Sequence, residues 1–177
     1  MFIKAIDENN NLLGIIHVKL FDDFAWLEGI RVSKDLRRKG IGRKLTEKAI
    51  ELSNKKTFRL IVNEKNDASL SLVKSMNFKE IDRVYFNDGK TMEINEIIKK
   101  YQLKQVDKID IKIKGFIHEW VWFPFEKYNG EFYVNNDMIL LETSPPFLIY
   151  NGNVEFKHNS NIRKENSEGF IVFELNI

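Results

Sequence analysis

The sequence contains no cysteine, only 3 prolines and 9 glycines, and only 3 histidines among its 177 residues. The absence of cysteine excludes disulfides, thiolate zinc sites, iron–sulfur clusters and a cysteine nucleophile. The histidines, at positions 17, 118 and 158, are too scattered in the sequence to predict a metal site. Little proline and glycine beside 43% hydrophobic residues excludes collagen-like and low-complexity chains and indicates a globular protein with a sizeable core.

Long apolar runs are also absent, so we expect no segment that spans a membrane. The first ten residues, MFIKAIDENN, contain acids and form no apolar run, so we expect no signal peptide. The net charge is +2, which is too balanced to favour a nucleic-acid partner. These observations predict a cytoplasmic protein that binds neither nucleic acid nor a membrane.

The first part of the sequence predicts three antiparallel strands in succession. Apolar and β-branched residues fill the ranges 1–7, 12–20 and 24–32, and short polar turns separate them. The third range, FAWLEGIRV, alternates in character. Because side chains of a strand point to opposite faces in turn, we expect Glu28 and Val32 on the same face.

Two helices and three further strands are predicted next. Apolar residues recur at helical spacing after Gly40, and Asn87-Asp88-Gly89 is a strong signal for a tight hairpin. The predicted elements are a helix from Gly40, a strand at 58–63, a helix at about 66–76 and strands at 78–86 and 90–97. The order of elements in this part is therefore βββ-α-β-α-ββ, an α+β arrangement with a mixed sheet.

The remainder of the chain differs in character, and we divide the chain into domains at 1–97 and 98–177. Residues 107–114, DKIDIKIK, alternate strictly and predict a strand. Residues 116–133 contain eight aromatic side chains, which fit a packed core or the interface of an oligomer such as a homodimer, with stacking on a ligand as the alternative. Further strand-like runs lie at 137–142, 147–150, 153–157 and 169–175. We therefore expect a small β-rich C-terminal domain, whose role the sequence does not indicate.

The most informative segment is the basic loop that follows the third strand. Arg37, Gly40 and Gly42 lie where this loop opens a helix. The unpaired N–H groups and the positive dipole end of a helix start favour phosphate, and glycine allows a close approach to the backbone. The alternative is that the glycines only begin the helix and that the basic side chains form a solvated face.

This pattern resembles the acetyl-CoA motif, R/Q-x-x-G-x-G/A, of the GNAT superfamily of N-acetyltransferases. A second motif of the family is similar to the segment that runs from Asn66 through Ala68, Leu72 and Asn77 to Phe78. Both motifs occur at the spacing of the family, and the resemblance covers about residues 1–97. It implies the GNAT fold, with acetyl-CoA as a co-substrate and no metal.

The sequence departs from the family pattern at several points. Ser69 replaces a small alanine, Asn77 replaces a glycine, and Val73 replaces the tyrosine that protonates the departing thiolate in many members. Valine has no proton to give, so the source of that proton is open. The strand and two helices that usually precede the meander in the family are also missing, because only about eleven residues come before Leu12.

The resemblance implies a cofactor position between the strands at 24–32 and 58–63. The pantetheine chain would pair with the backbone of the first strand, and the pyrophosphate would meet the N–H groups of the basic loop. The residues that the resemblance assigns to acetyl-CoA are Ile30, Arg31, Val32, Arg37, Arg38, Lys39, Gly40, Ile41, Gly42, Arg43, Asn66 and Ser69.

Glu28 is the candidate catalytic base. A primary amine with a pKa near ~10.4 is mostly protonated at neutral pH, so a base that removes its proton is useful. The alternative is a solvated strand residue or an ion-pair partner. His17, on the second strand, either faces the acceptor or is an ordinary strand histidine.

The function that these residues favour is transfer of an acetyl group from acetyl-CoA to a primary amine by direct attack. The amine belongs to a small molecule or to a protein, and the sequence does not indicate which. The alternative is a non-catalytic module that binds acetyl-CoA in a regulatory role, which Val73 and the short N-terminal part favour.

Overall fold

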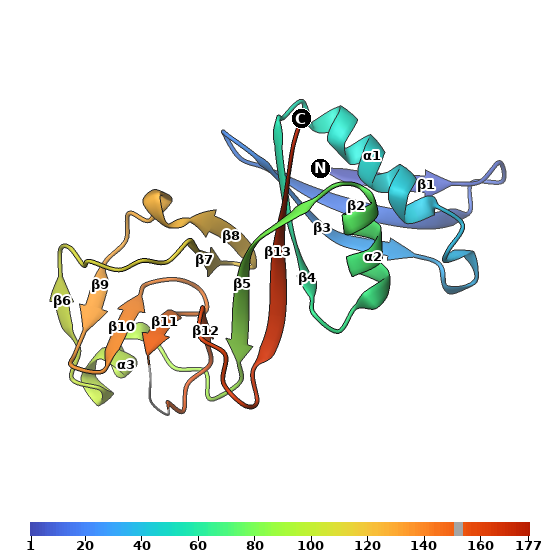
Figure 1. The fold of residues 1–177 in the computed structure, drawn as a ribbon. Helices are drawn as coiled ribbons and strands as arrows, with labels where there is room; N and C mark the ends of the chain where they lie inside the picture. The colour runs from blue at the N-terminus through green and yellow to red at the C-terminus, as the bar shows by residue number, and fades with distance from the viewer. Residues whose placement is uncertain (151–153) are drawn as a thin grey trace. The chain divides into compact units, whose positions relative to one another are not determined.

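The structure, a computed structural model, describes residues 1–150 and 154–177 and has mixed α+β character (Figure 1). It divides into two compact units, residues 1–81 with 172–177, and residues 82–171. These bounds differ from those of the predicted domains, because the end of the chain returns to the first unit. The division at residue 97 stays a prediction about domains. None of the helices in the described residues has the length and apolar character needed to cross a bilayer.

The first unit contains the predicted three-stranded meander, two helices and a parallel strand. Its elements are β1 (Phe2–Ile6), β2 (Leu12–Leu20), β3 (Ala25–Val32), a 3-10 turn (Lys34–Leu36), α1 (Ile41–Ser53), β4 (Thr57–Asn63), α2 (Asp67–Ser75), and parts of β5 (Lys79–Asn87) and β13 (Glu168–Asn176). Strands β1, β2 and β3 pair in antiparallel fashion, and β4 pairs with β3 in parallel. The strand next to β4 is β13.

Helix α1 packs closely on β2 because Gly14 has no side chain. A Cβ at Gly14 would lie 3.1 Å from Leu45 Cδ1 and 2.7 Å from the Arg31 carbonyl oxygen. The helix begins after Gly40 and ends at Asn54, both of which have left-handed backbone angles. The packing of α1 thus positions the loop at its N-terminus relative to β2 and β3.

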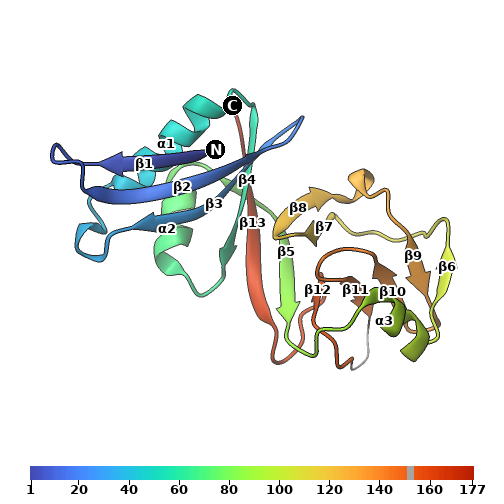
Figure 2. The ribbon, with the colours of Figure 1, turned by 180° about the vertical axis from the view of Figure 1, so that it is seen from behind.

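The predicted hairpin at 78–86 and 90–97 is wrong in its second strand. Residues 90–97 form no strand, and α3 (Ile94–Lys100) begins there with a capping box between Glu93 and Glu96. The strand beside β5 is instead β13. β5 and β13 run in opposite directions (Figures 1 and 2). The second unit is therefore an insertion between the last two strands of the predicted βββ-α-β-α-ββ order.

The second unit is rich in short strands, as predicted. Beyond α3 its elements are β6 (Lys104–Val106), β7 (Gly115–His118), β8 (Val121–Pro124), a 3-10 turn (Phe125–Lys127), β9 (Phe132–Val134), β10 (Met138–Leu141), β11 (Phe147–Tyr150) and β12 (His158–Ser160). The sheet order is β5-β12-β11-β10-β9-β6, and β7 and β8 form a separate hairpin. Seven buried side chains form its core cluster: Ile97, Leu103, Tyr133, Met138, Leu140, Leu148 and Phe156.

The other strand predictions for this part of the chain have different outcomes. The runs at 137–142, 147–150 and 169–175 correspond to β10, β11 and β13. Residues 107–114 form no strand, although their isoleucines are half-buried and their charged side chains exposed. In the run at 153–157, residue 153 lies outside the described residues, and the others form only an isolated bridge between Phe156 and Lys90.

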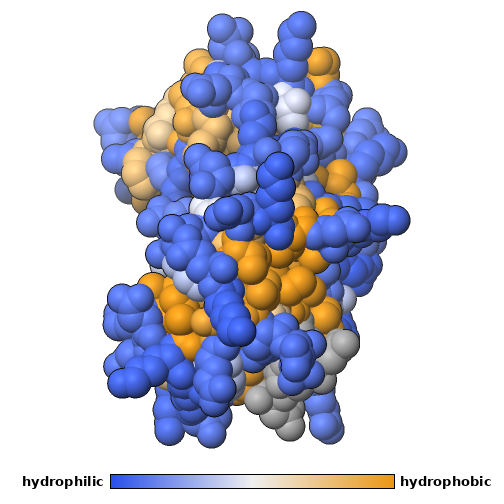
Figure 3. Space-filling view, turned by 90° about the vertical axis from the view of Figure 1, so that its left-hand side faces the viewer, coloured by the Kyte–Doolittle hydropathy of each residue, from blue (hydrophilic) through white to orange (hydrophobic). Residues whose placement is uncertain are grey.

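Some large apolar side chains stay on the surface. Phe2 is 69% exposed, and Leu20 and Trp120 are about half exposed. Figure 3 shows one face on which apolar side chains gather into a patch that polar side chains surround.

Candidate functional site

The two parallel strands β3 and β4 separate soon after they begin. They pair only at Ala25 with Phe58 and at Trp26 with Arg59. Beyond these residues β3 and β4 diverge (Figure 1). The backbone of β3 from Leu27 onward therefore has a free edge on the side of β4. A free edge can pair with an extended ligand, as an added strand would.

A bulge interrupts β3 at Gly29. His17 of β2 stands opposite Glu28, and Ile15 stands opposite Arg31, so two residues of β3 face one residue of β2. Gly29 has a φ of 63°, a left-handed value that favours glycine. Such a bulge turns a backbone N–H away from the regular ladder.

The bulge shows that the predicted face of Glu28 is wrong. Val32 stands opposite Gly14, which faces α1, whereas Glu28 stands opposite His17, three residues further along β2. Since alternate residues of β2 point to opposite faces, Glu28 and Val32 lie on different faces of the sheet. The extra residue at the bulge reverses the alternation that the sequence pattern indicated.

The basic loop ends at the N-terminus of α1, as predicted. Gly40 is the N-cap residue, with a φ of 80° and no side chain that could accept a bond from the helix. The first N–H groups of a helix have no acceptor within the helix, so those of α1 can meet an anion. The side chains of Arg37, Arg38 and Lys39 are exposed beside them. A Cβ at Gly40 would meet nothing within 4 Å, so the space in front of this helix end is open.

Gly42, the second residue of α1, allows close packing at this helix end. A Cβ on it would lie 3.4 Å from Leu72 Cδ2 of α2 and 4.0 Å from Val32 Cγ2 of β3. Its lack of a side chain thus lets α1 approach α2 and the end of β3. Ile41, the first residue of α1, is half-buried beside it.

Two of the predicted cofactor side chains, Arg43 and Asn66, form hydrogen bonds within the protein. The Arg43 guanidinium donates from Nη2 to the Ser75 carbonyl oxygen at 3.0 Å and to its hydroxyl at 2.7 Å. The Asn66 side chain accepts the Ser69 N–H at 3.1 Å and so caps α2. Arg43 and Asn66 therefore fix the two ends of α2.

The side chains at the end of β3 bond to backbone carbonyls. Arg31 Nη1 donates to the carbonyl oxygen of Ile30 at 3.1 Å, and Arg37 Nε donates to that of Val32 at 3.5 Å. These exposed arginines add positive charge near the free edge of the strand. Val73, which takes the position of the family tyrosine, is buried in α2 with 3% exposure.

Glu28 lies at the centre of a polar cluster on the face away from α1. Its Oε1 is 2.7 Å from His17 Nδ1, and its Oε2 accepts Trp26 Nε1–H at 3.1 Å. Lys19 Nζ is 3.4 Å from Oε2. Glu28 therefore forms an ion pair with Lys19, which is one of the alternatives to a catalytic role that the sequence left open. Trp26 and Lys19 were not predicted, although each lies two residues along a strand from its neighbour in the cluster.

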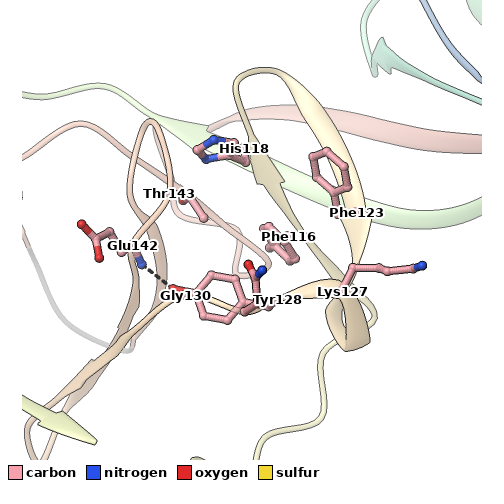
Figure 4. Close-up of a pocket in the computed structure, with 9 residues that line it drawn as sticks. Phe116, His118, Phe123, Lys127, Tyr128, Gly130, Glu142 and Thr143 are labelled. Atoms are coloured by element: carbon pink, nitrogen blue, oxygen red, sulfur yellow. Dashed lines mark hydrogen bonds between the residues drawn. The ribbon is translucent and has the colours of Figure 1, made fainter. Parts of the chain in front are cut away.

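The aromatic segment of the second unit packs mainly on itself. The ring of Phe116 lies 5.7 Å from that of Phe123 and 5.1 Å from that of Tyr128. These rings, with His118 and Thr143, line a cavity of about 220 Å³ (Figure 4). The Tyr128 hydroxyl, which accepts the N–H of residue 142 at 2.8 Å, is already engaged. Aromatic packing, one of the predicted alternatives, thus describes this segment.

Within residues 1–150 and 154–177, no three acidic or histidine side chains come together in a way that could hold a metal ion. The residues that fit a ligand are instead backbone groups: the free edge of β3, the bulge at Gly29 and the helix start at Gly40. This arrangement suits an extended molecule that carries phosphate at one end.

Residues 1–78 match the model of the acetyltransferase (GNAT) family. This match confirms, for these residues, the resemblance inferred from the two motifs. No curated protein matches the chain.

Three solved structures are similar to all or part of the chain. An inferred acetyltransferase from Thermoplasma acidophilum matches with a TM-score of 0.63 and 16% identity, over 98% of this chain and 77% of that chain. A GNAT-family acetyltransferase from Staphylococcus aureus Mu50 matches with a TM-score of 0.43 and 27% identity, over 46% and 54% of the two chains. The PaiA N-acetyltransferase of Thermoplasma acidophilum, solved with coenzyme A, matches with a TM-score of 0.44 and 27% identity, over 46% and 53% of the two chains. The first match shows a shared fold that includes the β-rich part.

Proposed function

We propose that this protein transfers an acetyl group from acetyl-CoA to a primary amine. The observation that carries the proposal is the early separation of β3 from β4 beside the open helix start at Gly40. Together these features supply an unpaired strand edge for an extended chain and N–H groups for a pyrophosphate. The exposed side chains of Arg37, Arg38 and Lys39 would add positive charge at the phosphate end.

The bulge at Gly29 supports a role in the chemical step. A backbone N–H that leaves the ladder can donate to the thioester carbonyl and stabilise the negative charge that develops on its oxygen. The N–H groups near Ile30 are the candidates, since β2 has only one residue opposite Gly29 and Ile30. Direct attack by the amine then requires no covalent intermediate on the protein.

Glu28 would take part in removing the proton from the attacking ammonium group. It directly precedes the bulge, and its side chain is 27% exposed. Val73 cannot supply a proton to the leaving sulfur, so the thiolate would leave unprotonated or take a proton from the amine. The acceptor amine, on a small molecule or a protein, is part of this proposal, while a homodimer and a cytoplasmic location stay predictions.

An assay of thiol release from acetyl-CoA with a panel of amines tests the proposal. We expect acetyl-CoA to raise the melting temperature, because a ligand that binds the folded state stabilises it. We also expect thiol release with at least one class of amine among polyamines, lysine peptides, N-terminal peptides and aminoglycosides. A protein that shows neither a shift nor turnover would contradict both binding and transfer.

The second candidate function is binding of acetyl-CoA without catalysis. The replacement of the family tyrosine by Val73, buried at 3% exposure, favours it. It predicts the same shift in melting temperature with no thiol release for any amine in the panel.

A further inference from the structure

His17 and Glu28 form a cross-strand pair directly beside the bulge of β3. They are register partners on β2 and β3, and Nδ1 of the imidazole lies 2.7 Å from Oε1 of the carboxylate. The His17 side chain is 24% exposed and that of Glu28 27%, so both are half-buried and neither is sealed from solvent. The pair lies on the sheet face opposite the one that α1 covers.

Both carboxylate oxygens of Glu28 are engaged by neighbouring donors. Oε1 receives the His17 bond, and Oε2 receives the Trp26 indole N–H at 3.1 Å, with Lys19 Nζ at 3.4 Å. These contacts fix the orientation of the Glu28 carboxylate and, through Oε1, that of the His17 ring.

The same contacts leave one nitrogen of His17 ready to accept a proton. A carboxylate accepts hydrogen bonds, so Nδ1 must carry the proton, and the lone pair is on Nε2. Among the residues that the structure describes, Nε2 has no hydrogen-bond partner. The ring of Phe2 stacks on the imidazole at 4.2 Å between centroids and holds its plane. A histidine oriented in this way by a carboxylate is the arrangement of a general base in nucleophilic enzymes.

We propose that His17 Nε2 is the proton acceptor of the acetyl transfer. Glu28 is then a positioning residue that orients the His17 ring and stabilises the positive charge that the ring gains with the proton. The inference rests on the proposed function. His17 would take one proton from the ammonium group, and the neutral amine nitrogen would form a bond to the thioester carbonyl carbon. The C–S bond then breaks, the sulfur leaves as the thiolate, and the proton remaining from the attacking nitrogen goes to that sulfur. The imidazolium returns its proton to solvent.

The test compares three variants of the full chain, His17→Gln, Glu28→Gln and the control His118→Gln. His118 is a strand histidine outside the proposed machinery, in the second unit. The measurements are turnover with the best amine of the panel between about pH 6 and about pH 10, and the shift in melting temperature with acetyl-CoA. Nitrogen NMR of the labelled imidazoles reports which ring nitrogen of His17 carries the proton in the protein alone.

We expect His17→Gln to lower turnover at neutral pH by about 100-fold or more, in the range of general-base effects, with recovery at high pH, where the amine loses its proton unaided. Glu28→Gln should lose less, about 10-fold, because the imidazole remains but is less well oriented. Both variants should keep the melting shift of the wild type, and His118→Gln should keep its turnover as well.

Two results would overturn the inference while the proposed function stands. The first is wild-type turnover in His17→Gln at neutral pH together with strong loss in Glu28→Gln, which would make Glu28 itself the base. The second is a His17 proton found on Nε2 rather than Nδ1. A wild-type protein without any amine turnover would instead overturn the proposed transfer and the inference with it.

Discussion

Arg59 and Glu174 are 115 residues apart in the sequence, and their side chains form an ion pair with 2.8 Å between Nε and Oε2. Arg59 lies on β4 and Glu174 on β13, and their side chains are only 12% and 19% exposed. Nearby, Thr57 donates to Asn176 Oδ1 at 2.8 Å. These contacts attach the last strand to the acetyltransferase unit.

Glu174→Gln should destabilise the protein by about 1–3 kcal/mol, because it removes the negative charge that pairs with the largely buried guanidinium of Arg59. The matched control is Glu51→Gln on the exposed Lys48–Glu51 pair, where we expect less than about 0.5 kcal/mol. Urea denaturation of the three proteins measures both changes. Equal effects of the two substitutions would show that the β4–β13 pair contributes no more than a surface pair.

Replacement of residues 88–167 by a short glycine-containing turn should give a soluble protein that still binds acetyl-CoA. The expectation follows from β5 and β13, which are neighbours in the sheet and run in opposite directions, so that a turn can join them. Size-exclusion chromatography and the melting shift with acetyl-CoA are the measurements.

The control for that deletion is a chain that ends at residue 171 and keeps the whole second unit. It lacks most of β13, so we expect aggregation or loss of the melting shift, because an unpaired strand edge is left on β4. If the chain ending at 171 behaves like the wild type, β13 is dispensable and this account of the first unit fails.

Gly40→Asp should abolish the melting shift with acetyl-CoA, since it places a negative charge at the helix start where the pyrophosphate would bind. Gly40→Asn is the matched neutral control, because asparagine tolerates the left-handed angle of this position. We expect the control to keep most of the shift. An unchanged shift in Gly40→Asp would place the phosphates elsewhere.

The buried His158 predicts a loss of stability on acidification. Burial lowers the pKa of His158 below its ordinary value of 6.5, and the bond to the Phe156 carbonyl offsets this only in part. Above this ordinary value both the folded and the unfolded chain hold a neutral imidazole, so the group adds no pH dependence to the stability. As pH falls below it, the unfolded chain binds a proton that the folded chain does not, and the free energy of unfolding falls until the folded pKa is passed.

Denaturation of the wild type and His158→Gln across this pH range measures that contribution. The variant should start less stable but lose less stability on acidification than the wild type. An identical slope in His158→Gln would assign the acid sensitivity to other groups.

The sequence predicted α1, β4 and α2 well because their signals are local. Helical spacing after Gly40 and the cap at Asn66 depend on residues a few positions apart. The strand beside β5 could not be found in this way. The turn signal at Asn87-Asp88-Gly89 is local, whereas the true partner strand lies at 168–176. The pairing of strands that lie so far apart in the sequence produces no pattern that a few neighbouring residues could reveal.

The candidate site was predicted more accurately for its backbone than for its side chains. The glycine loop and the two diverging strands lie where the motifs indicated, but the face of Glu28 was wrong because a single residue is added at Gly29. A glycine inside a strand is a known sign of a bulge, so this signal was available. The contact with His17 depends on the register of two strands, which the sequence does not specify.

The insertion between β5 and β13 also has a consequence for how the chain folds during synthesis. Residues 1–81 leave the ribosome first, but their sheet gains its last strand only after all of residues 82–171 have been made. Closing a flexible loop of that length costs conformational entropy, and an insert that has already folded holds its two ends at a fixed separation and removes much of the cost. The folded second unit would then hold the ends of β5 and β13 close together. Mutations in the core of the second unit would therefore slow the assembly of the first unit, although they lie outside it.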